Sequence, residues 1–228
     1  LKNISKSADI IELGFAHNTP IADGGEIQNS AYRAIKNGTK LNDTFKIVKK
    51  LKKIKNKKPL ILMGYWNLVL QYNENQFIKS CKQSGVNGLI IVDLPYPENK
   101  KFSKKCKKNG ITFVQLLSPT TSYKRMLKII KDSHMLYYIS MLSTTGGKLK
   151  VSPKEILRKY KIIKNLAKNK NCIIGFGITS KNISSFKKAD GCVVGSEICK
   201  KISESVKKRQ NPVTNVTNMV KKLKEKIL

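Results

Sequence analysis

Acidic residues are scarce in this chain of 228 residues, where 14 Asp and Glu stand against 46 Lys and Arg and give a formal net charge of +32. Such an excess makes nucleic acid or an anionic membrane the first partners to consider. The lysines, however, are distributed over the helical segments of the whole chain and form no single tail or patch. Lys, Asn and Ile, which share AT-rich codons, are abundant together. We therefore attribute the charge to genome composition and expect neither nucleic acid nor a membrane as partner.

Long apolar runs and paired cysteines are also missing. No apolar run approaches the length needed to cross a bilayer. The five cysteines show no CxxC spacing and no pairing with histidine, which excludes the usual zinc motifs. Unpaired cysteines of this kind are typical of a reducing compartment, so we expect a cytoplasmic protein that binds no metal.

Two acidic residues nonetheless occupy a short and otherwise apolar stretch. Residues 10–13 predict a buried parallel strand that carries Glu12. Burial would raise the pKa of this carboxyl group by desolvation and leave it able to act as a general acid. Asp23 follows a loop that could return it to face Glu12 across a pocket. Spacing alone leaves open that Glu12 is an ordinary strand-end carboxylate bonded to a backbone amide.

Apolar runs alternate with amphipathic segments of helical length along the chain. The runs cover residues 10–13, 60–63, 89–92, 112–117, 136–140, 172–176 and 192–194. The helical segments cover residues 41–53, 74–84, 98–109, 122–131, 153–167, 182–188 and 213–228. This alternation predicts one α/β domain with a parallel sheet. It fits a TIM (β/α)8 barrel that lacks one unit, or an open doubly wound sheet.

Glycines follow two of the late strands in a pattern typical of phosphate binding. Gly177 ends one predicted strand, and Gly195 and Ser196 come directly before a helical segment. Glycine lets the backbone approach an anion, and a helix start presents free N–H groups. Ser196 could add a hydroxyl donor and cap the helix. The loop that contains Gly146 offers a third anion-facing segment, although tight strand-to-helix turns alone would also explain these glycines.

Aromatic residues at strand ends predict a flat apolar slot. Tyr65, Tyr137 and Phe176 each lie at the end of a predicted strand. An apolar slot with one or two polar groups suits a ring the size of indole. Ordinary core packing is the alternative, above all for Phe176.

The chain also resembles a known family, the tryptophan synthase alpha chain. The resemblance begins with Ala8-Asp9-Ile10-Ile11-Glu12-Leu13-Gly14, Pro20-Ile21-Ala22-Asp23-Gly24 and Ile27-Gln28. It continues in order with Tyr65-Trp66-Asn67, Val92-Asp93-Leu94-Pro95, Ser118-Pro119-Thr120, Tyr137-Tyr138-Ile139-Ser140, Gly175-Phe176-Gly177-Ile178 and Gly195-Ser196. The resemblance favours the barrel, and it implies that the family's first β/α unit is missing or trimmed here.

The resemblance implies a reaction and a partner. The reaction is retro-aldol cleavage of indole-3-glycerol phosphate, a phosphate ester, to indole and glyceraldehyde 3-phosphate, with Glu12 and Asp23 as the catalytic pair. Thr145 would hold Asp23 when its loop closes. The partner would be the tryptophan synthase beta chain in an α2β2 heterotetramer. No cofactor is expected in this chain, because pyridoxal phosphate belongs to the beta chain.

Two loops depart from the family pattern. The loop after Glu12 usually reads Gly-Val-Pro-Phe-Ser-Asp-Pro, whereas residues 14–20 read Gly-Phe-Ala-His-Asn-Thr-Pro. The later mobile loop has Ser143 where the family has glycine. These changes leave open the alternative that the chain is weakly active and mainly activates its beta partner. Another phosphate-binding barrel enzyme is a further alternative, and a basic nucleic-acid-binding module is the least favoured.

Overall fold

The computed structural model describes residues 1–54, 58–140, 143–144, 147–148 and 152–228. The described chain forms two compact units, Leu1–Phe113 and Val114–Leu228, each described here by itself. The boundary between them falls within strand β4 (Thr112–Leu117). The expectation of a single domain over the whole chain stays a prediction.

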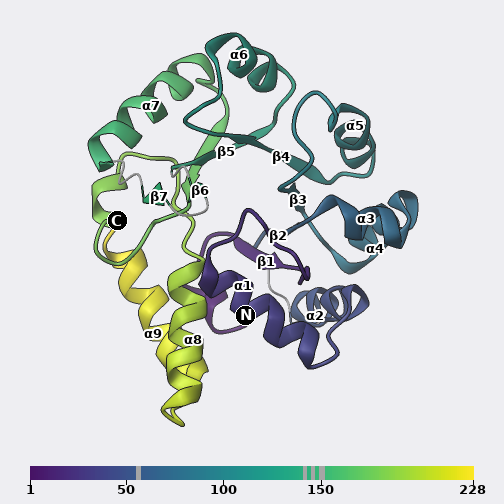
Figure 1. The fold of residues 1–228 in the computed structure, drawn as a ribbon, viewed down its shortest axis with the longest axis vertical. Helices are drawn as coiled ribbons and strands as arrows, with labels where there is room; N and C mark the ends of the chain where they lie inside the picture. Colours follow the sequence, from purple (N-terminus) through teal and green to yellow (C-terminus); the bar gives the residue numbers. More distant parts are fainter. Residues whose placement is uncertain (55–57, 141–142, 145–146, 149–151) are drawn as a thin grey trace. The chain divides into compact units, whose positions relative to one another are not determined.

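Parallel strands form the centre of the unit Leu1–Phe113. β1 (Ile11–Gly14), β2 (Leu60–Gly64), β3 (Gly88–Ile91) and the start of β4 pair in that order. The strands alternate with helices α1 (Gly25–Lys36), α2 (Leu41–Lys53), α3 (Trp66–Tyr72), α4 (Glu74–Ser84) and α5 (Lys100–Lys108) (Figure 1). A short 3-10 helix, η1 (Ile4–Lys6), precedes β1. β3 is buried throughout, as a parallel strand between helices should be.

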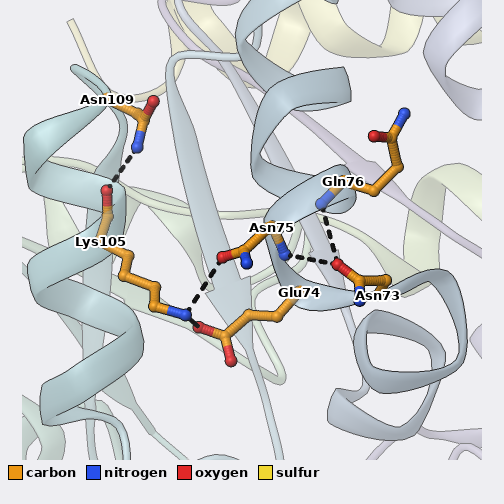
Figure 2. Close-up of polar contacts among 6 residues, drawn as sticks. All are labelled: Asn73, Glu74, Asn75, Gln76, Lys105 and Asn109. Atoms are coloured by element: carbon orange, nitrogen blue, oxygen red, sulfur yellow. Dashed lines mark hydrogen bonds and ion pairs between the residues drawn. The ribbon is translucent and has the colours of Figure 1, made fainter.

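Helix α4 shows how local sequence sets the ends of these elements. The Asn73 side chain accepts hydrogen bonds from the N–H groups of Asn75 and Gln76, and so caps the first turn (Figure 2). The helix ends at Gly85, whose φ of 88° is left-handed and suits glycine. Lys105 on α5 forms an ion pair with Glu74 at 2.7 Å and ties the two helices together.

The unit Val114–Leu228 continues the same pattern. The rest of β4 pairs in parallel with β5 (Met135–Ile139), which pairs with β8 (Asn171–Gly175). The helices are α6 (Tyr123–Lys131), α7 (Pro153–Leu166), α8 (Ser196–Lys207) and α9 (Pro212–Glu225), of which α8 and α9 lie side by side (Figure 1). Two-residue strands β6 (Ser143–Thr144) and β7 (Gly147–Lys148) pair antiparallel.

Most of the predicted elements are confirmed, and three predictions are wrong. Residues 192–194 form a single bridge from Cys192 to Ile174 and no strand, since glycines on both sides leave too short a run for a ladder. Residues 182–188 contain only the 3-10 helix η2 (Ile183–Phe186), whose serines compete for backbone hydrogen bonds. The strand-end position predicted for Tyr65 places it directly before α3. From the family resemblance we expected residues 65–70 to be a loop on a docking surface for a partner chain, and the prediction of a loop is wrong because Trp66–Tyr72 is helical.

Among the described residues, no helix combines the length and the apolar character required to span a bilayer.

Candidate active site

Glu12 lies on β1, where its backbone is opposite Ile61 of the neighbouring strand β2. The residues on both sides of Glu12 in the strand are apolar, and Glu12 itself is half-buried. Burial, and to a smaller extent the nearby charge of Asp23, together raise the pKa of the Glu12 carboxyl group from its ordinary value of 4.5 to about 7. The predicted rise is therefore confirmed, and Glu12 is partly protonated at neutral pH.

Asp23 is held by a side chain from the next strand along the sheet. Tyr65 follows β2 directly and is buried, and its hydroxyl donates a hydrogen bond to Asp23 Oδ2 at 3.0 Å. The same hydroxyl accepts the N–H of Ala22 at 3.1 Å, so both bonds fix the loop that carries the aspartate. Burial raises the pKa of Asp23, while the bond from Tyr65 opposes that rise. Tyr65 therefore orients an acid, a role its aromatic ring alone did not predict.

His17 is a member of this group that sequence reasoning missed. Its ring stacks on Tyr65 with a centroid distance of 4.9 Å and an angle of 26°. Nδ1 accepts the Thr19 N–H at 3.0 Å, which in the neutral ring places the proton on Nε2. Nε2 is buried and has no hydrogen-bond partner among the described residues. The family pattern has Phe at this position, and this aromatic residue was the feature of the sequence that could have pointed to His17.

A glycine at the end of β2 makes room for the loop that links the two acids. A Cβ atom at Gly64 would lie only 2.1 Å from the ring of Phe15, which is buried against it. Phe15 in turn packs edge-on against Phe77 of α4, with ring centroids 5.9 Å apart. The start of the loop after β1 is thus anchored in the core, which fixes the backbone from which the chain continues to Asp23.

The two carboxyl groups are therefore in different environments within one unit. Burial raises the pKa of both carboxyl groups, that of Glu12 to about 7, whereas at Asp23 the hydrogen bond from Tyr65 opposes the rise. Pairs of acids with separated pKa values are the usual arrangement for one proton donor and one electrostatic stabiliser. This arrangement suits an acid-catalysed bond cleavage.

In the other unit, residues at the end of β8 form a strained turn. Phe176 and Gly177 have φ angles of 65° and 73°, and the first is unusual for a residue with a side chain. The Ser140 hydroxyl donates to the carbonyl groups of Gly175, at 2.8 Å, and Phe176, which holds this backbone in place. Tyr137 is buried and meets the ring of Phe176 edge-on at 6.1 Å. Backbone strain of this kind is common at functional sites.

Gly195 and Ser196 stand where α8 begins. Gly195 is the N-cap residue and Ser196 is the first helical residue, so the predicted capping role of Ser196 is wrong. The reason is that the chain already turns at Gly195, which leaves the serine side chain exposed at the helix start. Gly177 is exposed as well. Backbone N–H groups at a helix start suit an anion.

The predicted site residues thus fall into two sets. Glu12, Asp23 and Tyr65 lie in Leu1–Phe113, and the structure brings these three together. Tyr137, Phe176, Gly177, Gly195 and Ser196 lie in Val114–Leu228. Thr145 and Gly146 lie outside the described residues. Within the described ranges, no three His, Cys, Asp or Glu side chains gather as metal ligands would.

Parallel strands that alternate with helices, with one acid on a strand and a second in the loop that follows it, are typical of enzymes of the TIM-barrel class. The comparisons with known proteins are more specific. The family model for the tryptophan synthase alpha chain matches residues 1–228. The chain is 69% identical over its whole length to the tryptophan synthase alpha chain of Pelagibacter ubique, of which it covers 86%. It is 37% identical to that of Petrotoga mobilis, with 95% of this chain and 84% of the relative covered. The chain belongs to the tryptophan synthase alpha chain family.

Solved structures agree. Tryptophan synthase subunit alpha from Legionella pneumophila superposes with a TM-score of 0.89 at 29% identity, covering 99% of this chain and 84% of the other. An alpha chain from the α2β2 complex of Pyrococcus furiosus superposes with a TM-score of 0.86 at 32% identity, covering 97% and 88%. The predicted fold class, a TIM barrel, is confirmed by these neighbours.

Proposed function

We propose that Glu12 and Asp23 carry out the lyase reaction of this family, the cleavage of indole-3-glycerol phosphate to indole and glyceraldehyde 3-phosphate in tryptophan biosynthesis. The observation that supports this assignment is the Glu12 carboxyl group, whose pKa is raised to about 7 by burial and by Asp23. A buried acid that keeps its proton near neutral pH is what protonation of a carbon atom requires.

The cleavage needs one proton delivered and one removed. Glu12 donates its proton to indole C3, and the bond from C3 to the first glycerol carbon then breaks as the hydroxyl on that carbon becomes the aldehyde. The Glu12 carboxylate left behind accepts the hydroxyl proton, which returns the acid to its starting form. Asp23 accepts a hydrogen bond from the indole N–H and stabilises the positive charge that develops on the ring.

The remaining predicted residues hold the two ends of the substrate. By the family resemblance, Tyr65, Tyr137 and Phe176 are assigned to the indole ring and Thr145 to Asp23. Gly146, Gly177, Gly195 and Ser196 bind the phosphate through backbone N–H groups and one hydroxyl. The turn at Phe176 and Gly177 and the exposed start of α8 support the phosphate assignment. The reaction uses no metal or organic cofactor in this chain.

The variant Glu12→Gln tests the assignment. It preserves shape and hydrogen-bonding capacity but cannot deliver a proton, so release of indole from indole-3-glycerol phosphate should stop while substrate still binds. Glu98→Gln is the matched control, since it removes an exposed carboxylate from the same unit. Near-normal turnover by the Glu12 variant would refute the role of this acid.

A chain that mainly activates a partner is the second candidate. The replaced residues between Glu12 and Asp23 favour it, because they lie in a loop that the family resemblance associates with signalling between subunits. Measuring beta-chain activity with the native chain and with Glu12→Gln separates the two roles. Equal stimulation by both would mean that activation does not depend on cleavage. Membership of the family sets aside the other phosphate-binding barrel enzymes.

We further propose a beta chain, which carries pyridoxal phosphate, as the partner in a cytoplasmic α2β2 assembly. The docking surface would comprise residues 15–27, 65–70 and 95–98, which contain no Lys or Arg. Within this surface Ile21 is 77% exposed and Leu70 is 54% exposed. Exposed apolar side chains of this kind are typical of a protein–protein interface. The double variant Asn18→Lys, Tyr96→Lys should abolish co-purification with the beta chain, and unchanged association would refute this surface.

A further inference from the structure

Glu197 lies in the first turn of α8, directly after Ser196, and reaches across to another loop of the same unit. Its two carboxylate oxygens accept hydrogen bonds from the backbone N–H and the hydroxyl of Ser180, each at 2.6 Å. Hydrogen bonds to a charged acceptor at this distance are among the stronger ones in proteins. Ser180 belongs to the segment that follows Gly177, so one side chain joins the two glycine segments proposed to bind phosphate.

Further side chains complete the bracing of this segment. The Ser180 carbonyl oxygen accepts a hydrogen bond from Lys226, which follows α9, at 2.6 Å. The Asn182 side chain accepts the N–H of Thr179 and donates to the Gly177 carbonyl oxygen, both at 2.8 Å. The backbone after Gly177 is therefore held by Lys226, Asn182 and Glu197, and the contact from Glu197 connects it to the start of α8.

A carboxylate at this position has two opposite effects on a bound phosphate. Its negative charge is close in sequence to Ser196 and repels an anion, which weakens binding. Its two hydrogen bonds fix the spacing between the segment at Gly177 and the helix start, which strengthens binding by removing the cost of ordering them. The two effects predict opposite results when the charge is removed, so a measurement can decide between them.

We propose that Glu197 is a positioning residue for the phosphate group of the substrate, acting through Ser180 on the segment after Gly177. The inference rests on the proposed phosphate site. Glu197 makes no contact with substrate in this role; it sets the distance between the backbone groups that do. Glu197 would thereby add some electrostatic repulsion but keep the phosphate-binding backbone groups at Gly177 and at the start of α8, here called the phosphate cradle, preformed.

The test compares Glu197→Gln with Glu204→Gln, which removes the same charge from the same helix without touching Ser180. Glutamine can still accept the Ser180 N–H and can donate to the Ser180 hydroxyl oxygen, but both bonds lose the charged acceptor and become weaker neutral hydrogen bonds. We expect Glu197→Gln to raise the KM for indole-3-glycerol phosphate about tenfold with little change in kcat. Glu204→Gln should leave KM unchanged or slightly lower. A lower KM in the Glu197 variant would overturn the proposal, because repulsion would then be the dominant effect.

A phosphate-free substrate separates positioning from general damage. In the reverse reaction, indole condenses with glyceraldehyde 3-phosphate or with glyceraldehyde, and only the first requires the cradle. Glu197→Gln should reduce the preference for the phosphorylated aldehyde about tenfold and leave the rate with glyceraldehyde unchanged. Equal losses with both aldehydes would show a merely structural role.

The variant Ser180→Ala provides a second and milder perturbation. It removes the hydroxyl bond to Glu197 and keeps the backbone bond, so the rise in KM should be smaller than in Glu197→Gln. Titration of the native chain with inorganic phosphate distinguishes the two proposals. Absence of phosphate binding to the native chain would refute the phosphate site itself, whereas equal binding to the native chain and to Glu197→Gln would refute only the positioning role.

Discussion

The replacement Glu12→Gln should stabilise the folded chain at alkaline pH while it abolishes catalysis. The native carboxyl group has a pKa of about 7 in the folded chain, against its ordinary value of 4.5. Below pH 4.5 the group is protonated and uncharged in both the folded and the unfolded chain, so its ionisation does not affect the stability there. Between pH 4.5 and 7 the unfolded chain releases the proton while the folded chain retains it, so the stability of the folded chain falls as pH rises.

The magnitude follows from the displacement of the pKa. Each pH unit of displacement corresponds to 1.36 kcal/mol, so the cost of ionising Glu12 in the folded chain is about 3 kcal/mol above pH 7. Glutamine never ionises and escapes this cost. The stability difference between Glu12→Gln and the native chain should therefore grow by about 3 kcal/mol from pH 4.5 to pH 8.5.

Urea unfolding at several pH values measures this growth. Any difference in packing between glutamine and protonated glutamate is the same at every pH, so the slope alone reports the ionisation. The control Glu98→Gln removes an exposed carboxylate from the same unit and is measured in the same way. In an Asp23→Asn background the slope should shrink, because the charge of Asp23 contributes to the raised pKa. A difference that stays constant from pH 4.5 to pH 8.5 would refute the desolvation of Glu12.

Three further outcomes are expected. Activity (kcat/KM) should decline as pH rises above about 7, where Glu12 loses the proton it must donate, and a pH-independent rate would count against its role as acid. Tyr65→Phe removes the donor to Asp23 and should lower kcat/KM about tenfold or more, with an acidic limb shifted to higher pH; an unchanged profile would contradict this. Gly175→Ala should destabilise the chain by about 1–3 kcal/mol, since its Cβ atom would lie 1.8 Å from the Tyr137 hydroxyl. Urea unfolding beside Gly25→Ala, which meets nothing within 4 Å, checks that value.

Some features were predictable because they depend on residues close together in sequence. Periodic apolar runs predicted α2 and α4 to the residue, since helix periodicity and end signals are local properties. The end of α4 at Gly85 is local as well, because the left-handed backbone there favours glycine. The predicted strand at residues 192–194 failed because pairing requires a partner over several residues, and only one bridge forms.

The sequence by itself determined the alternation of strands and helices, the presence of an acid in an apolar strand, and the family to which these motifs belong. Only the tertiary structure decided that Tyr65 donates to Asp23 and that His17 stacks on Tyr65, because these partners come from different elements. It also decided that Glu197 joins α8 to the segment after Gly177. Hydrogen bonds and ring contacts depend on distances of a few ångströms, and folding sets those distances between residues that are remote along the chain.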